Sequence, residues 1–170
     1  MPRLHGVAPF GSLPWRRRPD ILQLCEGLFG VECDQVHFGA LWNFPGSGPP
    51  HWHRDGQAPL LTAVTAVEDY PEEVGFIRLQ PFTQAGGRDE GSPSREPPRT
   101  DGGEHPAVQA QLRRGETLLF LYTTKHAPTP NLTELERLLL YSVYGPSGVR
   151  DTINFWESHL SLFEEVSRDA

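Results

Sequence analysis

The chain has 170 residues, a formal net charge of −7, 37% hydrophobic residues, and 17 glycines and 17 prolines. This length is enough for a single domain with a hydrophobic core, over residues 1–170. The acidic balance gives no support to nucleic-acid binding, which needs clustered positive charge. No apolar run has the length of a signal peptide or a membrane span, so we expect neither a nucleic acid nor a membrane as partner.

The cysteines and the N-terminal segment give two further expectations. Cys25 and Cys33 are too few for a disulfide framework, which favours a reduced, cytoplasmic protein. Residues 1–18 are irregular and predict an N-terminal arm. Nothing in the pattern indicates an oligomeric state.

The first predicted element is a short helix over residues 20–30. Asp20 is placed to cap its N-terminus and Gly30 to end it. The apolar stripe of this helix consists of Ile21, Leu24, Cys25 and Leu28.

Residues 36–44 then alternate with a period of two, which predicts a β-strand. His37 has the opposite parity to the apolar residues, so we expect it on the solvent side. The apolar positions are Val36, Phe38, Ala40, Trp42 and Phe44.

Four later segments rich in Leu, Val, Thr and aromatic residues also predict strands. At least five strands with few helices indicate an antiparallel sandwich or a closed barrel. In the last strand both faces are apolar, so we expect one of its ends to be buried on both sides. The segments are residues 59–69, 75–82, 117–123 and 137–145.

Two other segments have a different character. Residues 84–106 contain five Gly, four Pro and eight charged residues, which predicts a disordered or mobile insertion. Residues 151–166 carry Trp156, Leu160 and Phe163 at helical spacing, which predicts a C-terminal helix with Asp151 as its cap.

The stretch GPPHWHRDG, residues 48–56, contains the candidate metal ligands. His51, His53 and Asp55 occupy alternate positions, so an extended strand would turn all three to one face. His126, which follows the strand at 117–123, is the natural candidate for a ligand from a distant part of the chain.

Two ligand sets compete. His51, His53 and His126 would suit zinc or a cupin-type metal, whereas His53, Asp55 and His126 form the facial triad of non-haem iron(II) sites. A cupin site would carry an acidic residue a few positions after the second histidine. Gln, Ala and Pro stand there, at 57–59, which favours the second set.

Arg137 extends this site. It begins the strand at 137–145 and shares a strand face with Leu139 and Tyr141, so we expect it to point into the same cavity. A buried guanidinium needs an anionic partner, and a dicarboxylic 2-oxo acid would provide one with bidentate geometry.

In order, these motifs resemble the phytanoyl-CoA hydroxylase (phytanoyl-CoA dioxygenase) family of iron(II)- and 2-oxoglutarate-dependent oxygenases. The resemblance covers about residues 20–145. Two positions depart from the family pattern: Gln84 replaces a histidine, and Pro128 stands where a serine often lies near the cosubstrate. The matching motifs are His53-Arg54-Asp55, VGFIRLQPFTQ, RRGETLLF, and HAPTPN followed by Arg137.

The resemblance implies a mainly β fold, a double-stranded β-helix (a jelly-roll or cupin-like barrel) with a short N-terminal helix. It implies that His53, Asp55 and His126 are the catalytic metal ligands, and that Arg137 and Tyr141 bind the cosubstrate. Iron(II), 2-oxoglutarate and molecular oxygen would hydroxylate a small organic molecule, releasing succinate and carbon dioxide. The alternative is a jelly-roll metal-binding module, or a degenerate family member, without redox turnover.

Overall fold

The fold is known from a computed structural model. The predicted N-terminal arm, insertion and C-terminal helix lie outside its described residues, except for single residues at their edges. In the described part of the chain, no helix is long and apolar enough to cross a membrane. The described residues are 18–47, 51–84 and 106–151.

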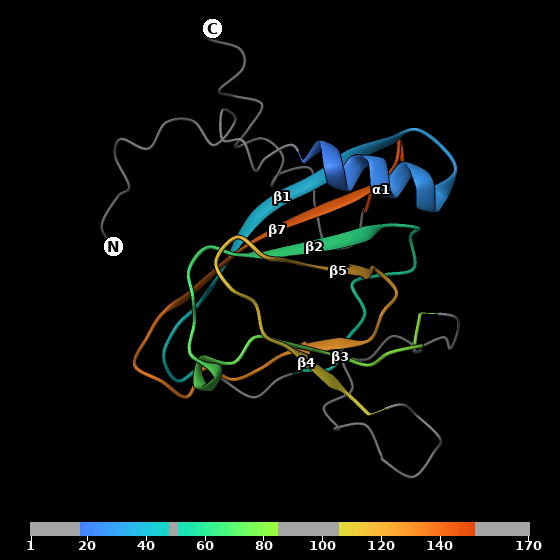
Figure 1. The fold of residues 1–170 in the computed structure, drawn as a ribbon. Helices are drawn as coiled ribbons and strands as arrows, with labels where there is room; N and C mark the ends of the chain where they lie inside the picture. The colour runs from blue at the N-terminus through green and yellow to red at the C-terminus, as the bar shows by residue number, and fades with distance from the viewer. Residues whose placement is uncertain (1–17, 48–50, 85–105, 152–170) are drawn as a thin grey trace, which may run out of the picture.

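The described residues form two antiparallel sheets and one short α-helix, which confirms the predicted mainly β class (Figure 1). The described strands do not close into a barrel. The main sheet has the order β1 (Cys33–Asn43), β7 (Arg137–Pro146), β2 (Leu61–Ala66) and β5 (Thr117–Leu121). The small sheet has the order β4 (Val108–Ala110), β3 (Ile77–Leu79) and β6 (His126–Pro128).

The small sheet packs against one face of the main sheet, which we call the inner face. Apolar side chains from both sheets form the core between them, and their burial drives the two layers together. This core consists of Val64, Ala66, Phe76, Ile77, Phe120 and Leu139.

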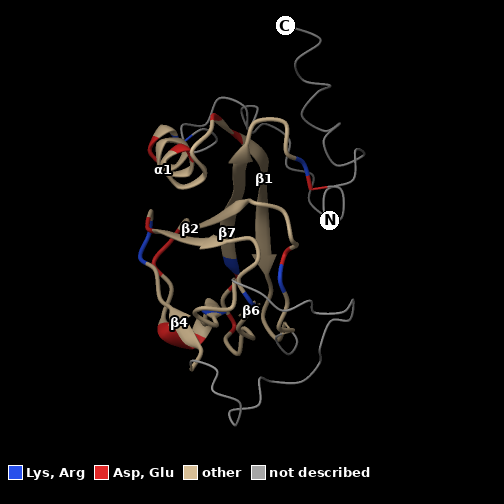
Figure 2. Ribbon diagram, turned by 90° about the vertical axis from the view of Figure 1, so that its right-hand side faces the viewer, with Lys and Arg blue, Asp and Glu red and all other residues tan. Residues whose placement is uncertain are grey.

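Helix α1 (Pro19–Phe29) covers the outer face of the main sheet at one end, away from β4 and β6 (Figure 2). Its N-cap is Arg18 and not Asp20 as predicted, because Pro19 suits the first helical position and Asp20 falls in the first turn. Gly30 ends the helix in the left-handed conformation, as predicted. The helix packs near Tyr144, which is 0% exposed, so this end of β7 is buried on both sides as expected.

Strand β1 differs from its prediction in the orientation of its side chains. A β-bulge between Gln35 and His37 inserts one residue, which reverses the alternation that a continuous strand would have. His37 therefore lies opposite Val143 on the inner face, and its predicted place on the solvent side was wrong. Trp42 and Phe44 are instead 52% and 54% exposed.

Asp151 was predicted as the cap of a C-terminal helix that lies outside the described residues. Its side chain is buried, and its carboxylate accepts a hydrogen bond from the hydroxyl of Tyr122, which directly follows β5.

Gly75 ends the short 3-10 helix η2 (Glu72–Val74) and allows a close approach to the segment after β6. Its φ of 69° is in the left-handed region, and a Cβ atom there would lie 2.0 Å from Oγ1 of Thr129. Only glycine avoids both the backbone strain and the clash.

We expect Gly75→Ala to lower the free energy of unfolding by about 2–4 kcal/mol, because it adds left-handed strain to overpacking. Gly27→Ala is the matched control. Gly27 lies in α1 with nothing within 4 Å of the added methyl, so this change should raise stability by about 0.5–1 kcal/mol. Urea titration measures both, and equal effects would contradict the packing role of Gly75.

Candidate metal centre

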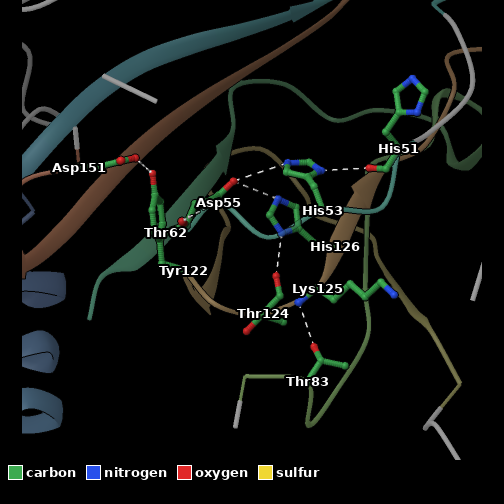
Figure 3. Close-up of polar contacts among 10 residues, drawn as sticks. All are labelled: His51, His53, Asp55, Thr62, Thr83, Tyr122, Thr124, Lys125, His126 and Asp151. Carbon is green, nitrogen blue, oxygen red and sulfur yellow. Dashed lines mark hydrogen bonds and ion pairs between the residues drawn. The ribbon is translucent and has the colours of Figure 1, made fainter. Parts of the chain in front are cut away.

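Three potential ligand residues converge between the two sheets. Nε2 of His53 lies 3.6 Å, and Nε2 of His126 3.5 Å, from the same Asp55 oxygen, Oδ1 (Figure 3). One potential ligand atom from each residue lies within 4.8 Å of the others. Ligand atoms about 2.1 Å from one ion and at right angles would be about 3 Å apart, so small side-chain movements would complete a site.

Backbone pairing holds the two histidines together. The N–H of each donates to the carbonyl of the other at 2.9 Å, and this isolated bridge joins the segment before β2 to β6. A separate hydrogen bond holds the backbone of Asp55, whose N–H donates to the carbonyl of Tyr122 at 3.1 Å. Main-chain hydrogen bonds therefore hold the backbone of all three ligand residues in place.

The far nitrogen of each imidazole sets its tautomer. Nδ1 of His53 lies 3.0 Å from the carbonyl of His51, and Nδ1 of His126 lies 3.0 Å from the carbonyl of Thr124. A carbonyl only accepts, so Nδ1 carries the proton in both rings and Nε2 keeps its lone pair. Both lone pairs lie on the side of Asp55, as metal coordination requires.

Asp55 is oriented by Thr62 of β2. The Thr62 hydroxyl donates to Oδ2 at 3.0 Å, while Oδ1 faces the imidazoles. This division of the two oxygens suits a carboxylate that binds a metal through one of them.

His51 contributes its carbonyl and not its ring. Its side chain is turned away from the other three residues in Figure 3 and belongs to an exposed residue. The grouping therefore matches the predicted His53, Asp55 and His126 set and not the three-histidine alternative.

The environment affects the two imidazoles in opposite directions. The Asp55 carboxylate raises the pKa of His53 because it favours the protonated ring, whereas burial lowers the pKa of His126. A metal binds only the neutral ring. His126 is thus prepared for coordination near neutral pH, and His53 is the ring at which protons compete with a metal as the pH falls.

A cavity of about 460 Å³ contains both the triad and Arg137. Its walls are mostly apolar, and an apolar environment strengthens electrostatic interactions. The apolar lining includes Leu41, Val64, Ile77, Phe120, Leu139 and Val143.

Arg137 is a buried cation without an acidic partner. It is 1% exposed, and it donates to the carbonyl of Val74 at 3.0 Å and to Thr129 at 3.4 Å. Its Nε has no hydrogen-bond partner, and no ion pair in the described part of the chain includes it. Burial lowers the pKa of Arg137, but a guanidinium keeps its charge in proteins. An anion in the cavity would offset this unfavourable burial.

Asn43 was missed by the sequence reasoning. It pairs directly with Arg137 across β1 and β7, so both side chains lie on the inner face, and both line the cavity. Ser47 accepts from the N–H of Asn131 and donates to Oδ1 of Asn43, which leaves the Asn43 amide N–H groups for another acceptor. An asparagine at the end of a strand gives no periodic signal, so only the strand register identifies it.

Tyr141 also lines the cavity, as predicted, and burial raises its pKa to about 12. Its hydroxyl lies 2.8 Å from Nε2 of His37, the second residue that the sequence reasoning did not select.

Fold and site define a class: a mainly β protein with two imidazoles and one carboxylate facing a buried arginine. The chain belongs to the phytanoyl-CoA dioxygenase family, whose model matches residues 24–138, as the motifs predicted. This family consists of non-haem iron oxygenases that depend on 2-oxoglutarate (alpha ketoglutarate), and the structures below are of an epimerase and a carbocyclase that are also described as alpha ketoglutarate dependent. No curated protein matches the sequence.

Three solved structures are similar. The non-heme alpha ketoglutarate dependent epimerase SnoN from nogalamycin biosynthesis is 28% identical with a TM-score of 0.66, covering 84% of this chain and 63% of SnoN. The structure of SnoN in complex with Fe3+, alpha ketoglutarate and nogalamycin RO is 24% identical with a TM-score of 0.63, and the match covers 84% of this chain and 63% of SnoN. The carbocyclase SnoK from nogalamycin biosynthesis is 22% identical with a TM-score of 0.62, and the match covers 84% of this chain and 61% of SnoK. The chain thus spans less than two thirds of the length of SnoN and SnoK.

We expect His53→Ala, Asp55→Ala and His126→Ala each to weaken Mn(II) binding at least about 100-fold, because each removes one of three ligands. His51→Ala is the matched control and should leave the affinity within about twofold, since only the backbone of His51 contacts the site. Anaerobic titration calorimetry measures all four. A His51→Ala loss as large as that of His53→Ala would instead support the three-histidine site.

Proposed function

We propose that the protein is an iron(II)- and 2-oxoglutarate-dependent dioxygenase that hydroxylates a small organic substrate and releases succinate and carbon dioxide. One observation carries this proposal: a single cavity is lined both by the three candidate ligands and by an unpaired, buried guanidinium. Bound iron and 2-oxoglutarate would supply the oxidising power that protein side chains lack.

His53, Asp55 and His126 would hold the metal from one side and leave its other positions for the cosubstrate and oxygen. Arg137 would bind the far carboxylate of 2-oxoglutarate through its Nε and guanidinium edge, with the amide of Asn43 as a second donor. This arrangement supports the proposal because Arg137 provides a cationic anchor for the cosubstrate. Such an anchor matters here, since Pro128 cannot donate the hydrogen bond that a serine at its position would donate.

The chain's own residues also protect and orient the reactants. Tyr141 keeps its proton, because burial raises its pKa to about 12, and we propose that its hydroxyl donates to the cosubstrate. The apolar walls would hold an uncharged part of the substrate near the metal and keep water out. Since a carboxylate, Asp55, stands at the position that a halide would otherwise take, we propose hydroxylation over halogenation.

The metal-binding module without turnover is less well supported, since it has no use for a desolvated Arg137 beside the metal site. For its compartment we propose the reducing cytoplasm, because Cys25 and Cys33 are both free and buried.

We expect anaerobic iron(II) and 2-oxoglutarate to give the weak visible charge-transfer band of the chelate, and His53→Ala to abolish it. In air, the wild-type protein should release succinate when a substrate library supplies a suitable molecule, with a product heavier by one oxygen atom. A folded wild-type protein without the band would contradict the proposal. A product of unchanged mass would point to isomerisation, the type of activity for which SnoN is named.

Arg137→Leu should raise the Kd for 2-oxoglutarate at least about 100-fold, since it removes a bidentate, charge-assisted contact. Arg137→Lys should give a smaller loss, because it keeps the charge without the planar fork. Mn(II) affinity should stay unchanged in both variants. Unchanged 2-oxoglutarate binding in Arg137→Leu would remove this residue from the cosubstrate site.

A further inference from the structure

The proposed ligand contacts leave one polar pair beside the cavity unexplained. Tyr141 and His37 contact each other across β7 and β1, with 2.8 Å between the Tyr141 hydroxyl and Nε2 of His37. Their ring centroids are 5.2 Å apart and the ring planes are inclined by 31°. Tyr141 lines the cavity, whereas His37 is not among the lining residues, so His37 would affect a ligand only through Tyr141.

Gly39 makes this contact possible. It lies directly opposite Tyr141, and a Cβ atom at this position would be 2.6 Å from the tyrosine ring. The ring therefore lies across β1 where only a glycine leaves room, which brings its hydroxyl to the level of His37.

The β-bulge supplies the second requirement. If residues 35–37 continued in regular alternation without the bulge, the imidazole of His37 would share the outer face of the sheet with Gln35. The bulge and Gly39 thus act on the same contact, one by turning His37 inward and the other by admitting the Tyr141 ring.

A tyrosine hydroxyl has one proton and two acceptor sites, and its O–H bond rotates readily. Because the oxygens of 2-oxoglutarate only accept hydrogen bonds, the Tyr141 proton is available to them when Nε2–H of His37 donates to the hydroxyl oxygen. This hydrogen bond fixes the rotation of the hydroxyl and leaves its O–H as the donor to the cosubstrate. A fixed donor or acceptor binds a ligand more tightly than a rotating one, because less conformational freedom is lost on binding.

We infer that His37 is a positioning residue, which holds the Tyr141 hydroxyl in the orientation that hydrogen-bonds 2-oxoglutarate. The inference rests on the proposed function, since it takes Tyr141 as a cosubstrate ligand. It assigns a role to the histidine of the edge strand and gives a reason for both the bulge and the glycine of β1.

Calorimetric titration of the Mn(II)-loaded full chain with 2-oxoglutarate tests the inference without requiring turnover. His37→Leu and Tyr141→Phe should each raise the Kd about tenfold, and the double variant should be no weaker than Tyr141→Phe alone. His37→Gln, which can still reach a hydroxyl, should recover most of the affinity. Mn(II) affinity should be the same throughout.

Gln35→Leu is the matched control. It removes a different hydrogen bond between β1 and β7, the 3.2 Å contact from Gln35 to Ser142, on the opposite face of the same strands. Its Kd for 2-oxoglutarate should equal that of the wild type.

The outcomes separate the two proposals. A wild-type protein that binds Mn(II) but not 2-oxoglutarate overturns the proposed function. If the wild type binds and His37→Leu binds equally well, the positioning role is wrong. If His37→Leu weakens binding as much in the Tyr141→Phe background as in the wild type, the histidine acts through strand stability and the inference is again overturned.

Discussion

Two reciprocal backbone hydrogen bonds between His53 and His126, each 2.9 Å long, are the constraint on which the site depends. They join a segment before β2 to β6, although the two residues are far apart in the chain. Because each Nδ1 also donates to a carbonyl two residues earlier, the same short stretches of backbone set the position and the tautomer of each imidazole. The metal centre is thus largely a property of strand pairing.

The second constraint is electrostatic. Arg137 is almost fully buried, and its hydrogen-bond partners among the described residues are neutral, an arrangement that an anion in the cavity would make more favourable. Two features hold it there: Gly75 lets η2 approach Thr129, and both Val74 and Thr129 accept hydrogen bonds from the guanidinium. The site is therefore organised for a negatively charged ligand, which reduces the reorganisation needed on binding.

Strand β1, at an edge of the described main sheet, adds Asn43 to the cavity lining and contacts Tyr141 through His37. Its inner face carries His37, Gly39 and Asn43, which lie opposite Val143, Tyr141 and Arg137 of β7. An edge strand tolerates a bulge more readily than a central strand, because it has a partner on one side only. The bulge is the reason why the predicted orientation of His37 was wrong. Its position in β1 reverses the direction of the side chains with little loss of sheet pairing.

The sequence by itself determined the mainly β class, five of the seven described strands, the helix end at Gly30, and the grouping of His53, Asp55 and His126 with Arg137. These follow from local periodicity, from capping and from an ordered set of motifs. Only the tertiary structure decided that His37 faces inward, that Asn43 lies beside Arg137 and that Asp151 is buried against Tyr122. The physical reason is that a bulge, a register and a buried pair depend on partners distant in the chain, to which local alternation carries no information.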